Sequence, residues 1–133
     1  IILGLPGESR ETVLRTIDYL NRLPIQGVKL QLLHVLSDSD LADLYRAGEY
    51  TPLEKEEYLT LVGDCIAHLR ADIVLHRLTG DGDKNTLLAP LWSLRKRDVL
   101  NHLHRYLREN HIRQGMSCKI DLSVIYNKPK DVL

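Results

Sequence analysis

Three short stretches carry side chains that could do chemistry, and each follows an apolar run of strand-forming residues. They are the glycine turn at 4–8, the segment at 34–40 and the polar loop at 76–83. In α/β proteins with parallel strands, ligands bind at the carboxyl ends of the strands. We therefore expect the three stretches to meet at one rim of a sheet and to form a ligand site there.

The glycine turn combines flexible backbone with the start of a helix. Glycines after a strand let a ligand approach the backbone closely, and a helix amino terminus favours anions. A phosphate loop needs Lys and then Ser or Thr after its last glycine, whereas Glu8 follows Gly7 here. The turn is better suited to an uncharged adenine or ribose. The alternative is that its glycines only relieve steric crowding in a tight turn.

Two histidines lie near the ends of neighbouring predicted strands. His34 and His76, together with Asp81 and Asp83, are residue types that bind metals. Their spacing matches no metal motif, so we predict no metal site. Because strand side chains alternate, His76 and Arg77 should face opposite sides of the sheet. The structural alternatives are a hydrogen-bonded core histidine at position 34 and an ion pair between Arg77 and a loop aspartate.

A basic helix is predicted near the carboxyl end. Arg97, Arg105 and Arg108, with His104, lie close to one helical face and could contact the phosphates of RNA. The ordinary alternative is a solvated charged face. The whole chain of 133 residues is neutral, with 18 Lys and Arg against 18 Asp and Glu. Bulk charge therefore favours neither a nucleic acid nor an anionic membrane.

Only two cysteines are present, Cys65 and Cys118. Cys65 falls in the apolar stripe of a helix, and Cys118 has no Cys or His at ligand spacing, so we predict neither as a nucleophile or cluster ligand. Two cysteines without a secretory segment fit a reducing compartment, which predicts a cytoplasmic protein. No apolar run reaches about 18 residues, so we expect no membrane span.

The elements that position these residues alternate between strand and helix. Strands are predicted at 1–3, 28–36 and 72–78, with Ser9, Asp38 or Ser39, and Thr51 as the helix caps. Gly48 should end the short helix after the second strand. This order predicts parallel βαβ units with right-handed crossovers, and an almost continuously apolar middle strand that is covered on both faces.

Beyond Pro90 the pattern changes. Ser93 is predicted to cap the basic helix, and Gly115 to close it. Alternating apolar residues at 118–126 predict an antiparallel or edge strand. The fold class is therefore α/β, with three parallel strands that form part of a barrel or open sheet and a helical carboxyl-terminal extension.

In order along the chain, IILGLPGE, VKLQLLHVL, LADLYRAGEY, LHRLTGD and APLWSL resemble the carboxyl-terminal half of radical S-adenosylmethionine (radical SAM) proteins. The resemblance runs to about Gly115 and is closest to an uncharacterised bacterial branch related to the radical enzymes of the elongator acetyltransferase group. It implies the last parallel strands of a six-stranded partial (β/α) barrel at 1–90, followed by an extension at 91–133 with the basic helix and a terminal strand.

The resemblance also implies site residues. The positions that match the S-adenosylmethionine site are Ile2, Gly4, Gly7, Glu8, Leu33, His34 and Val35. A catalytic wall toward the substrate would consist of His76, Arg77 and Asp81. Relatives usually carry a Gly-Thr pair where this chain has Asp38 and Ser39, which changes the geometry of that turn but keeps a hydroxyl group.

Full-length radical SAM enzymes hold a [4Fe-4S] cluster on a CxxxCxxC loop after the first barrel strand. The cluster cleaves S-adenosylmethionine to a 5′-deoxyadenosyl radical, which abstracts hydrogen from the substrate. Nothing in this sequence supplies that loop. We therefore expect the chain to start at the fifth strand, to lack the amino-terminal half of its barrel, and to be inactive and unable to bind the cluster alone.

The resemblance and the basic helix together suggest partners. Several radical SAM enzymes modify tRNA, so tRNA or another RNA is an expected partner of the full-length parent, as is the missing half of the barrel. The exposed edge of the first strand predicts self-association. The alternative function is an RNA-binding or nucleotide-binding α/β module without radical chemistry.

Overall fold

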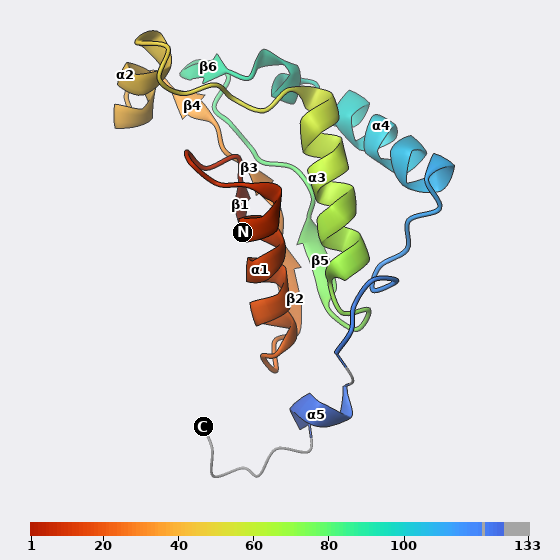
Figure 1. Cartoon of the computed structure of the whole chain (residues 1–133). Helices are drawn as coiled ribbons and strands as arrows, with labels where there is room; N and C mark the ends of the chain where they lie inside the picture. The colour runs from red at the N-terminus through yellow and green to blue at the C-terminus, as the bar shows by residue number, and fades with distance from the viewer. Residues whose placement is uncertain (121, 127–133) are drawn as a thin grey trace.

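The computed structural model describes residues 1–120 and 122–126 (Figure 1). The strands are β1 (Ile2–Leu3), β2 (Gly27–Lys29), β3 (Gln31–Leu32), β4 (Val35–Leu36), β5 (Val74–Arg77) and β6 (Leu87–Ala89). The helices are α1 (Arg10–Asn21), α2 (Asp40–Arg46), α3 (Lys55–His68), α4 (Lys96–Glu109) and α5 (Ser123–Tyr126), with the 3₁₀ turn η1 at Leu91–Leu94.

The predicted parallel strands are confirmed. β1 pairs in parallel with β3, and β2 pairs in parallel with β5. The predicted second strand is divided into β2, β3 and β4, so a single extended segment is shared by neighbours on both sides. Its last piece, β4, pairs antiparallel with β6, a strand that the sequence did not indicate.

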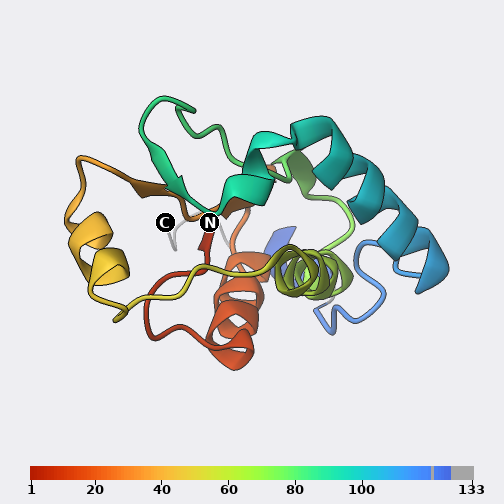
Figure 2. The same ribbon diagram turned by 90° about the horizontal axis from the view of Figure 1, so that it is seen from above.

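One face of this segment is buried, which corrects the prediction that both faces are covered. Val28, Leu30 and Leu32 are buried in the hydrophobic core, whereas Lys29 between them is exposed. Helices α1 and α3 pack side by side on the same face of the strands (Figures 1 and 2). The alternation along the segment therefore follows from helices that cover one side of the sheet.

Local capping signals position two helices as predicted. Ser9 caps α1 and accepts a hydrogen bond from the Thr12 N–H at 3.2 Å. Ser39 caps α2, and Gly48 beyond the end of that helix has φ +75°. These caps depend only on neighbours in sequence, which is why they could be predicted.

The predicted cap of α3 at Thr51 is wrong. The helix begins at Lys55, and Glu54 is its N-cap, with the Glu54 N–H donating to Glu57 Oε2 at 2.8 Å. The segment before it stays extended because Leu53 packs on the core and its carbonyl accepts from Trp92 Nε1 at 3.1 Å. A tertiary contact thus moves the helix start by one turn.

The predicted cap of the basic helix at Ser93 is also wrong. Ser93 lies in η1, where its hydroxyl donates to the Pro90 carbonyl at 2.7 Å, and α4 starts later. Val99 and Leu103 of α4 join the core built by α1, α3 and the strands. The domain boundary at 90/91 stays a prediction.

The predicted terminal strand at 118–126 is wrong in the part that the structure describes. Its end forms the short helix α5, in which Ile125 is buried. The Tyr126 hydroxyl donates to Asp72 Oδ2 at 3.2 Å, and its ring lies 5.9 Å from the Arg70 guanidinium. These contacts with the α3–β5 connection hold a helical turn where the alternating pattern predicted an extended chain.

Among the described residues, no helix has both the length and the apolar character needed to cross a membrane.

Candidate functional site

The predicted cofactor positions lie at one end of the sheet. Leu3 stands opposite Leu32 in the parallel pair, so Gly4 and the segment 33–35 follow the strands at the same rim. Gly4 has φ +98° and Gly7 has φ +75°, a left-handed backbone that favours glycine. The Tyr50 hydroxyl donates to the Gly4 carbonyl at 2.7 Å and fixes the turn from the side of α2.

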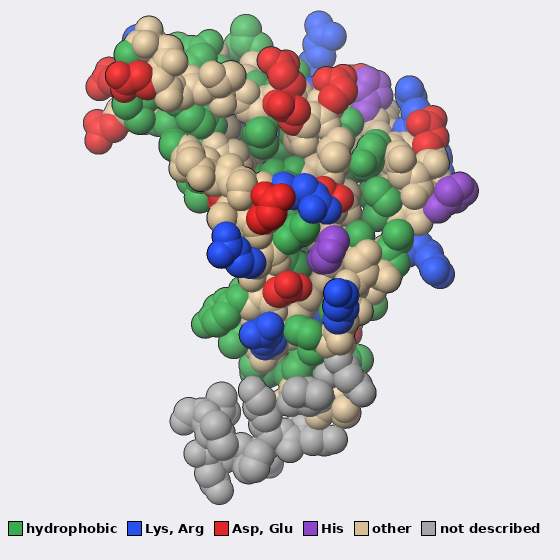
Figure 3. Space-filling view, in the orientation of Figure 1, with side chains coloured by type: hydrophobic (Ala, Val, Ile, Leu, Met, Phe, Trp, Pro, Cys, Tyr) green, Lys and Arg blue, Asp and Glu red, His purple; other side chains and the backbone are tan. Residues whose placement is uncertain are grey.

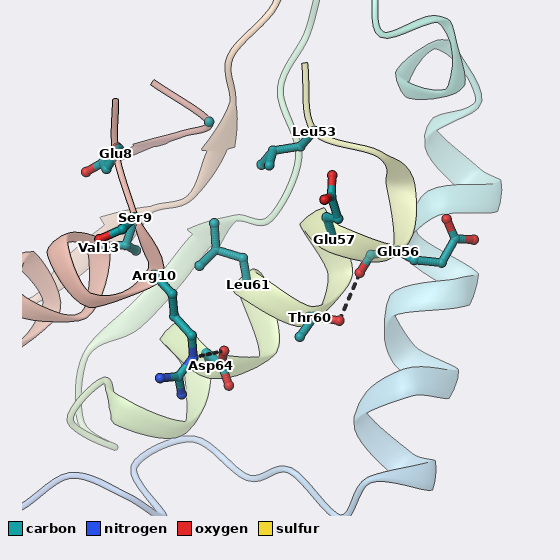
Figure 4. A pocket seen from close by; sticks show the side chains of 11 residues that line it. Glu8, Ser9, Arg10, Val13, Leu53, Glu56, Glu57, Thr60, Leu61 and Asp64 are labelled. Carbon is teal, nitrogen blue, oxygen red and sulfur yellow. Dashed lines mark hydrogen bonds and ion pairs between the residues drawn. The ribbon is translucent and has the colours of Figure 1, made fainter. Parts of the chain in front are cut away.

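The turn divides the predicted cofactor residues between two surfaces. Ile2 is 44% exposed, whereas Leu3 beside it is fully buried toward the helices. Glu8 instead lines a pocket of about 460 Å³ between α1 and α3, with Leu53 and Leu61 across from it (Figure 4). Gly4 lines the same pocket as Glu8, whereas Ile2 and the segment 33–35 are not among its lining residues.

That pocket is closed at one end by an ion pair. Arg10 Nε lies 2.7 Å from Asp64 Oδ2, joining the first turn of α1 to α3 (Figure 4). One oxygen of Glu8, Oε2, is shielded from solvent and has no hydrogen-bond partner in the described part of the chain. No local sequence pattern indicates this pocket, because its walls come from two helices that meet only in the fold.

His34 lies beneath the glycines of the loop after β5. A Cβ atom added at Gly80 would be 2.7 Å from His34 Cε1, and one at Gly82 would be 3.3 Å from Cγ. Burial, and then the charge of Lys96, lower the pKa of His34. The imidazole is therefore neutral at pH 7, and its Nε2 has no hydrogen-bond partner among the described residues.

Of the three residues predicted to face the substrate, Arg77 and Asp81 lie together and His76 does not. Arg77 Nη2 lies 3.6 Å from Asp81 Oδ2, so the ion-pair alternative for Arg77 is what the structure shows. Asp81 also pairs with the ammonium group of Lys96. His76 points elsewhere, against Gly27 and into a pocket lined by Ile1, Leu20 and Ile25.

The sequence does not indicate the other residues that lie beside Asp81. Lys84, Ser93 and Lys96 line a pocket of about 190 Å³ with the loop 80–82. The contact between Lys96 and Asp81 reaches across β6 and η1, and no local pattern predicts it. The run of basic residues 95–97 is the one signal in the sequence, and by itself it indicates an RNA-binding or solvated helix face.

The basic face of α4 is open to solvent. Arg97, His104, Arg105 and Arg108 are all exposed. Basic and histidine side chains gather along the margin of the molecule over α4 (Figure 3). His104 and Arg108 also line a pocket of about 560 Å³ at the end of this helix. The arrangement leaves the arginines available to a partner, and their contact with nucleic acid stays a prediction.

The cysteines do not fit an iron-sulfur cluster. Burial raises the pKa of Cys65 to about 12, and its side chain belongs to the hydrophobic core. Cys118 Sγ lies 3.6 Å from Asn21 Nδ2. Among residues 1–120 and 122–126, no three His, Cys, Asp or Glu side chains are grouped to hold a metal ion.

Parallel strands with crossover helices on one face define an α/β partial barrel. Residues 25–109 match the model of the Radical_SAM C-terminal domain family. The chain belongs to this family, as the resemblance of its motifs implied.

Curated relatives come from bacteria and archaea. The chain is 33% identical over 115 residues to the uncharacterized protein YtqA of Bacillus subtilis, covering 86% of this chain and 36% of that protein. It is 33% identical over 112 residues to the protein YhcC of Escherichia coli K12, and this match covers 84% of this chain and 36% of that protein. It is also 33% identical over 116 residues to the uncharacterized protein MJ0486 of Methanocaldococcus jannaschii, and this match covers 86% of this chain and 36% of that protein. The chain therefore spans about a third of the length of these relatives.

A solved structure shares the fold. The archaeal Methanocaldococcus infernus Elp3 with an N-terminus deletion superposes with a TM-score of 0.67, at 15% sequence identity. The match covers 85% of this chain and 26% of that one. Most of the chain therefore shares its α/β fold with part of that structure.

Proposed function

We propose that this chain forms the carboxyl-terminal wall of a radical SAM enzyme and holds the adenosine part of S-adenosylmethionine. The family match over residues 25–109 carries the proposal. Reductive cleavage of the cofactor is the chemistry that an iron-sulfur cluster supplies, and the described residues have no ligand set for one. In the proposed whole enzyme, residues outside this chain would hold the cluster. The relatives, of which the chain covers 36%, are long enough to contain such residues.

The chain's own residues would bind and orient the cofactor. The exposed Ile2 offers an apolar surface for an adenine ring, and the left-handed Gly4 lets the ring approach the backbone. The backbone of 33–35 leaves β3 at the same rim and could flank the ring from the other side. Glu8, which lines the pocket between α1 and α3, would act by shaping the turn.

Titration of the chain with S-adenosylhomocysteine tests this assignment. We expect saturable amide shifts at Ile2, Gly4 and 33–35 in ¹⁵N-resolved NMR spectra. Ile2→Asp should weaken binding by about tenfold or more, because it replaces an apolar contact with a charge. Tyr19→Asp, at a 62% exposed position on α1, is the matched control and should bind normally. Equal binding by both variants would contradict the adenosine site.

Anaerobic reconstitution with iron and sulfide tests the missing cluster separately. The buried, protonated Cys65 cannot serve as a thiolate ligand without unfolding the core. We expect no stoichiometric cluster and no reductive cleavage of S-adenosylmethionine. A specific [4Fe-4S] spectrum from the folded chain would overturn this expectation.

A second candidate function is RNA binding, which the exposed basic face of α4 favours. If Arg97, Arg105 and Arg108 contact phosphates, affinity should fall as salt concentration rises. A plot of log affinity against log salt concentration should then have a slope of roughly −2 to −3. Changing all three to Gln keeps helix propensity and should remove most of that slope. Bulk tRNA is the probe, and Arg15→Gln on α1 combined with Arg22→Gln at the C-cap of that helix is the control. No binding at low salt, or an unchanged slope, would leave a small-molecule substrate as the better hypothesis.

A further inference from the structure

The loop after β5 and the start of α4 enclose a small polar pocket. Its lining includes Gly80, Gly82, Lys84, Ser93 and Lys96, and its volume is about 190 Å³. Pockets that hold whole small molecules measure roughly 300–1,000 Å³. This pocket therefore has room for one functional group of a larger ligand.

Positive charge predominates at this pocket. Lys84, Lys96 and the adjoining Arg77 face a single carboxylate, that of Asp81, which pairs with two of them. Lys84 is exposed, and no ion pair in the described part of the chain includes it. The nearby Asp83 carboxylate accepts from the Asn85 N–H at 3.0 Å. Arg77 and Lys96 thus share the Asp81 carboxylate, whereas Lys84 has no ion-pair partner among the described residues.

The Asp81 contacts are of a kind that a ligand can replace. Its side chain is 57% exposed, and the 3.6 Å separation from Arg77 Nη2 is longer than a hydrogen bond. Exposed ion pairs of this type contribute little to stability. The Asp81 carboxylate thus stands where an oxyanion of a ligand would meet the same cations.

The surrounding backbone favours an anion as well. Gly80 and Gly82 leave the loop without side chains toward the His34 ring, so the backbone packs closely there. Helix α4, 14 residues long, begins beside the pocket with no side-chain hydrogen bond from its cap Arg95. Its first-turn N–H groups and positive dipole end add to the attraction of the lysines.

We propose that this pocket, formed by Gly80, Gly82, Lys84, Ser93 and Lys96, binds an oxyanion group of the substrate, a phosphate or a carboxylate. The inference rests on the proposed function in that it assigns the rim after β5 to the substrate. Arg77 and Lys96 hold the anion after Asp81 swings out, and Lys84 closes over it from the solvent side.

Inorganic phosphate is the first probe, exchanged for chloride at constant ionic strength and followed by amide shifts in ¹⁵N-resolved NMR spectra. We expect saturable shifts at Gly80, Gly82 and Ser93. Lys84→Gln should weaken phosphate binding several-fold. Lys119→Gln, at an exposed position outside the pocket, is the matched control and should have no effect. Absence of saturable shifts, or equal effects of both variants, would overturn the proposal.

Asp81→Asn separates a ligand site from a mere ion-pair network. If Asp81 competes with the ligand, its removal should strengthen phosphate binding at least about threefold, as expected for the loss of a like charge. A purely structural network would lose stability without gaining affinity, and that result would overturn the proposal. Both Lys84 and Asp81 are exposed, so their substitutions spare the core.

Acetate, titrated in the same way, distinguishes the two ligand chemistries. Tighter binding of phosphate indicates a phosphorylated substrate, and equal binding of acetate indicates a carboxylate-bearing one. Titration of the same variants with S-adenosylhomocysteine should give unchanged affinity, since Ile2 and Gly4 are not altered. If the unaltered chain binds phosphate but not S-adenosylhomocysteine, the proposed function is contradicted; if it binds S-adenosylhomocysteine but not phosphate, this inference is contradicted.

Discussion

Gly80 is a residue at which a single methyl group should be costly. Its Cβ would lie 2.7 Å from His34 Cε1, closer than side-chain carbons approach. We expect Gly80→Ala to lower the free energy of unfolding by about 1–3 kcal/mol, the usual cost of overpacking. Urea denaturation measures this change.

A double-mutant cycle identifies the cause of that cost. His34→Ala removes the ring, so Gly80→Ala should cost much less in that background. Gly48→Ala is the control: it is strained by its φ of +75° but has no atom within 4 Å of the added Cβ. Its cost should be independent of His34. If His34→Ala fails to relieve the cost at Gly80, the loop does not pack on the imidazole.

At the residue scale, the sequence predicted what depends on local backbone chemistry. Gly4 and Gly7 follow a strand and precede a helix cap, and both adopt the left-handed backbone that such a turn requires. The pairing of Lys96 with Asp81 could not be predicted in this way, since 15 positions and two elements separate the two residues. The separation of His76 from Arg77 was predictable because side chains alternate along a strand.

Arg70 ties three elements together at the end of α3. It is 2% exposed, and its guanidinium donates to the carbonyls of Asn21 at 2.6 Å, Leu23 at 3.1 Å and Ile25 at 3.2 Å. Those carbonyls belong to the last residue of α1 and to the connection from α1 to β2. A single buried cation thus satisfies backbone groups that a long connection would otherwise bury without partners.

Replacement of this cation should be severe. Arg70→Met keeps most of the volume but leaves three carbonyls without donors, so we expect a loss of about 3–5 kcal/mol in the free energy of unfolding. Asp72→Asn is the matched control, because an amide oxygen still accepts from Arg70 at a partly exposed site. Thermal and urea denaturation compare the two variants. Similar losses would show that the ion pair, and not the carbonyl bonds, is the source of stability.

Element boundaries show where local patterns lose to tertiary contacts. The TPLE stretch has the residues of a capping box, yet the Leu53 carbonyl is bonded to Trp92 and the helix starts later. The alternating apolar residues near the end suit a strand, yet Ile125 and Tyr126 pack as a helical turn on the α3–β5 connection. In both cases a partner distant in sequence decides the backbone.

For the whole molecule, the edge of β1 predicts self-association. In the described part of the chain β1 pairs with β3 alone, and Ile2 and Leu5 are 44% and 42% exposed beside the other edge. An unpaired edge with apolar side chains recruits another strand. We expect concentration-dependent sedimentation that Ile2→Lys reduces and that Tyr19→Lys on α1 leaves unchanged. A monomer at all concentrations would contradict this.

The extended segment from β2 to β4 passes from one neighbour to the next within ten residues. The Leu30 N–H donates to the Arg77 carbonyl at 2.8 Å, the next N–H, of Gln31, to the Ile1 carbonyl at 2.9 Å, and that of Ser37 to Thr86 at 2.8 Å. We expect the amides of Leu30, Gln31 and Ser37 to exchange with solvent deuterium at similar rates, because loosening one pairing displaces the segment that the other pairings need. β1, β5 and β6 should therefore open and close together with this segment as one cooperative unit.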